Sequence, residues 1–164
     1  MMKRTLLLLS LLLFIGGVAA VSAQTSASER QGTVYYTPKQ NSLNYSIWID
    51  DIEFGPRRTI VTMHYLRAKG GANLIPSTKL ICHLKGGKTK VLALQGTRGI
   101  SMTKDRYTQL GRGEVFQAYF PALAPAEVAK IKSVDFMEDP SGMAGGNVFN
   151  ITGIKISKKH QVIR

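Results

Sequence analysis

The 164-residue sequence has few of the residues that build covalent or metal-held scaffolds. Its one cysteine, Cys82, excludes a disulfide within one chain, so stability must come from packing. Zinc would need several His and Cys ligands, and three histidines with one cysteine are a thin supply. The sequence has no Gly-x-Ser-x-Gly elbow and no glycine-rich loop leading into a helix. The sequence therefore lacks the familiar signatures of serine hydrolases and nucleotide-binding proteins.

Helical periodicity is also lacking after the N-terminal segment. A spacing of 3.6 residues between apolar positions does not persist, and Ala126 to Lys130 is the only expected helical turn. Short stretches of alternating apolar and polar residues recur instead, separated by glycine and proline. This pattern predicts an all-β fold: an antiparallel β-sandwich of immunoglobulin-like architecture with seven or eight strands over residues 33–157. A partly open barrel is the alternative.

The alternation also predicts which side chains point inward. A phase change at Thr152-Gly153 predicts a β-bulge, and one at Asp50-Asp51 predicts a second bulge or a bend. Gly86-Gly87 occupies a hairpin position. Residues 69–73 are expected to form a loop and residues 96–112 a long connection. The predicted core contains Val61, Met63, Leu80, Cys82, Leu84, Leu92, Leu94, Phe116, Phe120, Val134, Phe136, Phe149 and Ile151.

The N-terminus is typical of a secretory signal peptide. A short basic segment, MMKR, precedes a nearly unbroken apolar run from Leu6 to Ala20. The small residues before Gln24 fit the cleavage pattern, which places cleavage between Ala23 and Gln24. The apolar run is short for a bilayer span, and this favours cleavage over a retained membrane anchor. We therefore expect export to the periplasm or the exterior, with residues 24–32 as a disordered lead.

Positive charge dominates the chain. The 22 lysines and arginines outnumber 10 acids, for a formal net charge of +12. Such a charge favours an anionic glycan, a lipid surface or an acidic envelope protein as partner, or it serves solubility alone. Export argues against nucleic acid as the partner.

Residues 158–164 are expected to form a basic, frayed tail. If the basic residues at predicted turns, strand ends and the tail converge, they form a basic patch: Arg57, Arg58, Lys85, Lys88, Lys90, Lys155, Lys158 and Lys159.

Six of the ten acids fall into two groups, each placed at a predicted strand end. If the two ends are neighbours, the carboxylates could hold Ca²⁺ or serve glycoside hydrolysis. The simpler interpretation is that they meet lysines or water. The calcium candidates are Asp50, Asp51, Asp135, Glu138 and Asp139, with Glu53 completing the first group.

Two further residues are candidates for chemistry or binding. Cys82 is adjacent to His83, but successive strand residues point to opposite faces, so a buried, inert thiol is expected. Trp48 is out of phase with Ile47 and Ile49, so it either faces outward beside tyrosines such as Tyr35, or packs under a loop. The candidate ligand-binding residues are Trp48, Lys155, Lys158 and Lys159.

Several segments resemble a β-sandwich module of secreted Bacteroidetes proteins. They are SIWIDDIEFGPRRTIVTMHY, GGKTKVLALQGTRGI, GEVFQAYFPAL, VDFMEDPSG and FNITGIKI, which cover most of residues 46–156. In such proteins the module often precedes a thioredoxin-like domain, and it has no assigned activity. This sequence has no Cys-x-x-Cys and ends after the sandwich, so the resemblance implies no redox activity.

Together these features predict an exported, non-enzymatic binding or accessory module of the cell envelope. We expect no cofactor and no transmembrane segment once the signal peptide is removed. The alternative is a calcium-dependent or carboxylate-using hydrolase that acts on glycans.

Overall fold

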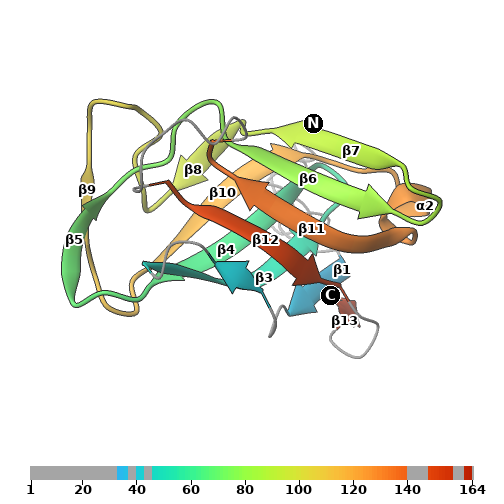
Figure 1. Cartoon of the computed structure of the whole chain (residues 1–164), viewed down its shortest axis with the longest axis horizontal. Coiled ribbons are helices and arrows are strands. Elements are labelled where there is room, and N and C mark those ends of the chain that lie inside the picture. The colour runs from blue at the N-terminus through green and yellow to red at the C-terminus, as the bar shows by residue number, and fades with distance from the viewer. Residues whose placement is uncertain (1–32, 37–39, 43–45, 140–147, 157–160, 164) are drawn as a thin grey trace, which may run out of the picture.

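A computed structural model describes residues 33–36, 40–42, 46–139, 148–156 and 161–163. Two antiparallel sheets pack face to face, and a small third sheet extends one end of the molecule (Figure 1). The predicted all-β sandwich is confirmed. The predicted leader, its cleavage site between Ala23 and Gln24, and the lead over residues 24–32 lie outside the described residues. Among those described, no helix is both long and apolar enough to cross a membrane.

The larger sheet has six strands. In spatial order they are β13 (Gln161–Ile163), β1 (Thr33–Tyr36), β3 (Ile47–Phe54), β4 (Arg58–Tyr65), β10 (Val115–Pro121) and β8 (Gly96–Arg98). β4 lies inside this sheet, between β3 and β10, and its alternation is typical of a strand with one buried face. Its even-numbered positions face outward, whereas Thr59, Val61, Met63 and Tyr65 are buried.

The second sheet has five strands. They are β2 (Asn41–Ser42), β12 (Asn150–Lys155), β11 (Ile131–Met137), β6 (Lys79–Leu84) and β7 (Thr89–Ala93). The helical turn α2 (Pro125–Val128) lies on the connection from β10 to β11, which carries the chain from one sheet to the other. The β6–β7 hairpin and α2 therefore lie at the same end of the sandwich, on the right in Figure 1.

The core lies between the two sheets. All thirteen predicted core residues are buried. Phe120 of β10 and Phe136 of β11 meet across the interior with ring centroids 6.1 Å apart and an interplanar angle of 90°. An edge-to-face pair of this kind contributes beyond its buried area, so this contact ties the sheets together.

Both predicted bulges are confirmed. The register between β3 and β4 shifts between Ile49 and Asp51. In the second sheet, Val134 faces Ile154 and Phe136 faces Ile151, so Thr152 and Gly153 share the place opposite Asp135. Gly153 has a φ of 64°, a conformation that glycine adopts at little cost. The Gly153 amide donates to Asp135 Oδ1 at 2.8 Å, which satisfies a group that the bulge removes from the ladder.

Several segments predicted as connections contain strands. Residues 69–73 and 96–112 include β5 (Lys69–Ala72), β8 and β9 (Thr108–Gly111), and β5 pairs with β9. The tail also departs from the prediction, because β13 pairs with β1. The described residues therefore contain thirteen strands, not seven or eight. The extra strands are only two to four residues long, which is too short for alternation to identify them.

Candidate functional site

Basic side chains gather at the end of the sandwich that carries the β6–β7 hairpin. The register brings the β3–β4 turn to this end, because Arg58 pairs with Pro121 at the end of β10. The start of β11 is there as well, since Leu84 pairs with Ile131, and so is the end of β12. The eight basic residues of this end, which we call the basic end, are Arg57, Arg58, Lys85, Lys88, Lys90, Lys130, Lys132 and Lys155.

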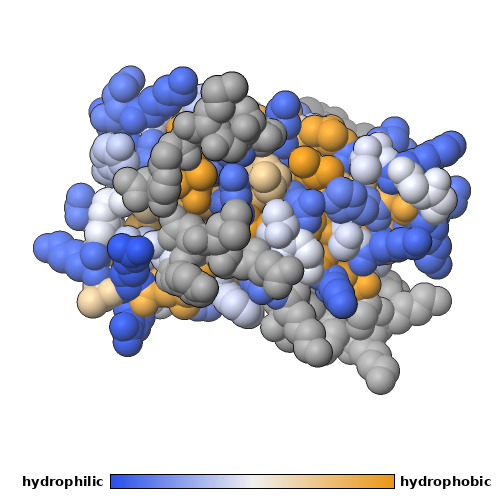
Figure 2. All heavy atoms as spheres, viewed as in Figure 1, coloured by the Kyte–Doolittle hydropathy of each residue, from blue (hydrophilic) through white to orange (hydrophobic). Residues whose placement is uncertain are grey.

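Acids are scarce at the basic end. In the part of the chain that the structure describes, they are Glu53 and Glu127, with Asp135 one register step beyond Lys90 and bonded to His83. Figure 2 shows hydrophilic side chains projecting at both ends of the molecule, and the hairpin lies at the right-hand end. The opposite end is more evenly mixed. Its basic residues are Arg67, Lys69, Lys79, Lys104, Arg106 and Arg112, and its acids are Asp105, Glu114, Glu138 and Asp139. The positive charge is therefore concentrated toward one end of the molecule.

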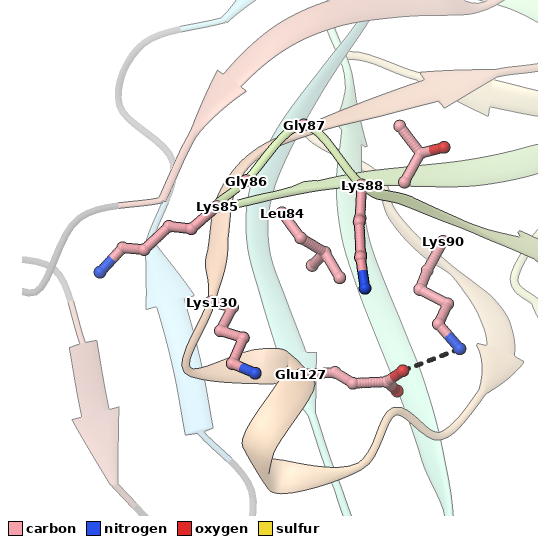
Figure 3. A pocket seen from close by; sticks show the side chains of 9 residues that line it. Leu84, Lys85, Gly86, Gly87, Lys88, Lys90, Glu127 and Lys130 are labelled. Atoms are coloured by element: carbon pink, nitrogen blue, oxygen red, sulfur yellow. Dashed lines mark ion pairs between the residues drawn. The ribbon is translucent and has the colours of Figure 1, made fainter.

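A shallow pocket lies between the hairpin and α2 (Figure 3). Leu84 through Lys90 form one wall, and Glu127 with Lys130 form the other. The hairpin turns through Gly86 and Gly87, whose φ angles of 84° and 76° lie in the left-handed region that favours glycine. The Lys85 amide donates to the Lys130 carbonyl at 2.8 Å, which fixes the hairpin against the end of the helical turn.

Glu127 is the one carboxylate among the described residues that line this pocket. Its Oε1 accepts from Lys90 Nζ at 2.8 Å, and its Oε2 accepts a long hydrogen bond from the Ala124 amide at 3.4 Å. The hydrogen bond from Lys90 lowers the pKa of Glu127, helped by the charges of Lys90 and Lys130 and opposed by partial burial. The carboxylate is therefore ionised at neutral pH, and it holds Lys90 in place.

The two predicted acidic groups do not meet. Asp50 and Asp51 lie within β3, and Asp135 lies within β11, so the prediction that they occupy strand ends is wrong. Asp50 bonds to His64, which alternates with buried residues of β4, so both point away from the core. Asp135 alternates with buried Val134 and Phe136 and points outward from the other sheet. The core thus separates the two groups, and such carboxylates cannot share one ion.

Glu138 and Asp139 serve the local structure. Glu138 is only 3% exposed, and its carboxylate accepts the amides of Ile75 at 3.2 Å and Phe149 at 2.7 Å. Burial raises the pKa of Glu138, against the lowering effect of these two hydrogen bonds. Asn150 Oδ1 accepts the amides of Glu138 and Asp139. Across the described ranges, no group of three or more His, Cys, Asp or Glu residues could hold a metal ion.

Two histidine–aspartate pairs were not anticipated from the sequence. His64 Nδ1 lies 2.7 Å from Asp50 Oδ1, and His83 Nε2 lies 2.7 Å from Asp135 Oδ2. Each pair is diagonal across neighbouring strands, on the outer face of its sheet. Side chains two positions apart on adjacent strands come within reach. The histidines and aspartates of both pairs are visible in the sequence, but their pairing could be predicted only from the strand register.

Trp48 lies on the outer face of the six-stranded sheet, half-buried and opposite His64. Tyr35 is not beside it: Tyr35 is 6% exposed and packs against Phe54. Lys155 is exposed at the end of β12, and Lys158 and Lys159 lie outside the described residues. Trp48 and the basic end are therefore not parts of one compact site.

Cys82 is buried in the core, with 0% exposure. Burial, assisted by the negative charge of Glu127, raises its pKa to about 12. The reactive thiolate is therefore scarce at neutral pH. This agrees with the expectation of a small packing residue.

No protein-family model, curated protein or solved structure matches this chain.

Proposed function

We propose that this protein is an exported, non-enzymatic binding module of the cell envelope that engages an anionic partner through its basic end. The observation that carries the proposal is the gathering of eight basic residues at that end, where acids are few. A cationic surface of this kind attracts anionic surfaces and speeds their encounter. The leader-like N-terminus and the resemblance to secreted Bacteroidetes modules support export.

The arrangement of the acids favours binding over glycan hydrolysis. Glycosidases usually place two carboxylates about 5 to 9.5 Å apart across the scissile bond. Here Asp50 and Asp135 point outward from different sheets. Glu138 is buried and held by two backbone amides. None of these residues forms a carboxylate pair around an open site.

Retention on anionic columns tests the proposal. The exported protein should bind a sulfated or carboxylated matrix, and elute as salt rises, because the Debye length falls from about 10 Å at 0.1 M to about 3 Å at 1 M. The triple variant Lys85/Lys88/Lys130→Gln should elute at clearly lower salt than wild type. Lys69/Lys104/Arg106→Gln removes the same charge from the opposite end and is the matched control.

Equal shifts in the two triple variants would show that net charge alone governs retention, and would overturn the proposal. Absence of retention at low salt would leave the charge as a solubility device.

A further inference from the structure

The pocket between the β6–β7 hairpin and α2 offers ammonium groups together with one carboxylate acceptor. We propose that it binds an acidic sugar residue of a polysaccharide, with Lys88 and Lys130 facing the sugar's anionic group and Glu127 accepting its hydroxyls. This inference rests on the proposed function and names the ligand class at the basic end.

The directions of the lysine side chains define the cationic part of the pocket. Lys88 and Lys90 extend from the hairpin toward the helical turn, whereas Lys85 points away (Figure 3). Lys90 is bound to Glu127. Among the described residues, no ion-pair partner is found for Lys88 or Lys130. Two ammonium groups therefore remain to face a carboxylate or sulfate held in the pocket.

Glu127 distinguishes this pocket from a simple cationic patch. Its side chain is 29% exposed, and its two oxygens accept one short and one long hydrogen bond from protein. A carboxylate has about four lone-pair sites, so it can accept more. The carboxylate repels every anion, and a duplex DNA backbone has no free hydroxyl that could offset this repulsion by donating to it. A sugar hydroxyl can donate to it, and a hydrogen bond to a charged group is stronger than a neutral one.

The apolar side chains also favour a glycan over a bilayer. The hairpin tip, Lys85 to Lys88, carries no apolar side chain that could enter a membrane. Peripheral membrane binding draws on buried apolar area as well as on charge. Of the exposed large apolar residues described, Tyr107 and Val115 lie at the opposite end and only Val91 lies near the hairpin. Leu84, 7% exposed, lines the pocket and offers a small apolar contact for a sugar ring.

The Glu127→Gln substitution gives a discriminating test. Glutamine can still accept from the Ala124 amide, as in a capping box, so α2 should keep its start. The variant is more positive than wild type by one charge. It should therefore bind anionic phospholipid vesicles and duplex DNA more tightly. Its affinity for polygalacturonate, a linear polymer of acidic sugars, should fall roughly tenfold if a hydrogen bond to a charged group is lost.

The experiment measures the affinity of the full exported protein for polygalacturonate, neutral dextran, anionic vesicles and duplex DNA at one ionic strength. Lys88→Gln and Lys130→Gln should weaken polygalacturonate binding more than Lys69→Gln, the control at the opposite end. Dextran should not bind. Far-ultraviolet circular dichroism and thermal unfolding confirm that each variant is folded.

The outcomes separate this inference from the proposed function. Tighter binding of every polyanion by Glu127→Gln would overturn the acidic-sugar site but leave anion binding intact. An equal loss on polygalacturonate and vesicles would show that Glu127 only positions Lys90, and would also overturn the site. Failure of wild type to bind any of the polyanions would refute both proposals.

Discussion

Phe136 joins the two sheets through its contact with Phe120 and has no exposed surface. Phe136→Ala should lower the free energy of unfolding by about 3–5 kcal/mol, because it removes a large buried side chain and leaves a cavity. Chemical denaturation measures the change. Val115→Ala removes an exposed side chain from β10 and should change stability by less than about 0.5 kcal/mol. Similar costs at the two positions would contradict the assigned core.

Glu138 should make stability depend on pH in a defined direction. Its native pKa lies above the ordinary value of 4.5, mainly because it is buried. The folded state therefore binds this proton more tightly than the unfolded state does. The contribution of Glu138 to the unfolding free energy is therefore largest when the pH is below the ordinary pKa. It falls as the pH rises through the native pKa.

Comparison with Glu138→Gln isolates this contribution. The unfolding free energy of wild type minus that of the variant should fall as pH rises from the ordinary value of 4.5 through the raised native pKa, as measured by urea unfolding at each pH. A difference that grows with pH would mean that the native state stabilises the charged carboxylate, contrary to the assignment.

At the scale of single residues, alternation predicted the core well. Met63, Leu80 and Phe116 were all assigned inward from a period of two, and all are buried. The roles of the acids were not predictable in this way. Asp135 meets His83 from another strand and the Gly153 amide across a bulge. These contacts depend on register, which the sequence pattern specifies only indirectly.

Among the elements, the β6–β7 hairpin is the one that the basic end depends on. Gly87 has a φ of 76°, so Gly87→Ala should destabilise the fold by about 1–2 kcal/mol, although the new methyl group would meet no atom within 4 Å. Thermal unfolding measures this cost.

Gly96→Ala is the matched control. A Cβ at Gly96 would make only ordinary contact with Tyr119, at 3.7 Å, and its φ is not left-handed. The control should be neutral or slightly stabilising, since alanine restricts the unfolded chain more than glycine does. If both variants lose the same stability, the backbone argument for the hairpin fails.

The elements that the sequence pattern missed share a physical cause. β5 is Lys-Gly-Gly-Ala, and β8 has three residues, so neither offers a run of alternating apolar positions. Pairing through the backbone defines them: β5 with β9, and β8 with β10. The longer strands β3, β4, β6, β10 and β11 were all predicted, because each carries several inward apolar residues.

For the whole molecule, the proposed export leads to a prediction that is independent of binding. The secreted protein should begin at Gln24, because the small residues before it fit a signal-peptidase site. N-terminal sequencing of protein recovered from the periplasm or medium checks this. A recovered protein that retains Leu6 to Ala20 would contradict the signal-peptide interpretation.

The arrangement of charge over the whole fold was only partly predictable. The sequence indicated that Lys85, Lys88 and Lys90 lie near one turn, but their meeting with Lys130 depends on how β10 crosses to β11. The same topology puts the outward-pointing Asp50 and Asp135 on different sheets. The strand order decides which side chains come together in space. It brings these lysines together at the basic end, and it keeps the two acidic groups apart.

The most direct test of the basic end as the binding surface is amide chemical-shift mapping on the isotopically labelled exported protein. During titration with polygalacturonate at low salt, the largest shifts should fall on Lys85 to Lys90 and Glu127 to Lys130, and added salt should reverse them. Lys69 on β5 and Gln109 on β9, at the opposite end, should shift less. Shifts concentrated around β5 and β9, or spread evenly over the surface, would contradict binding at the basic end.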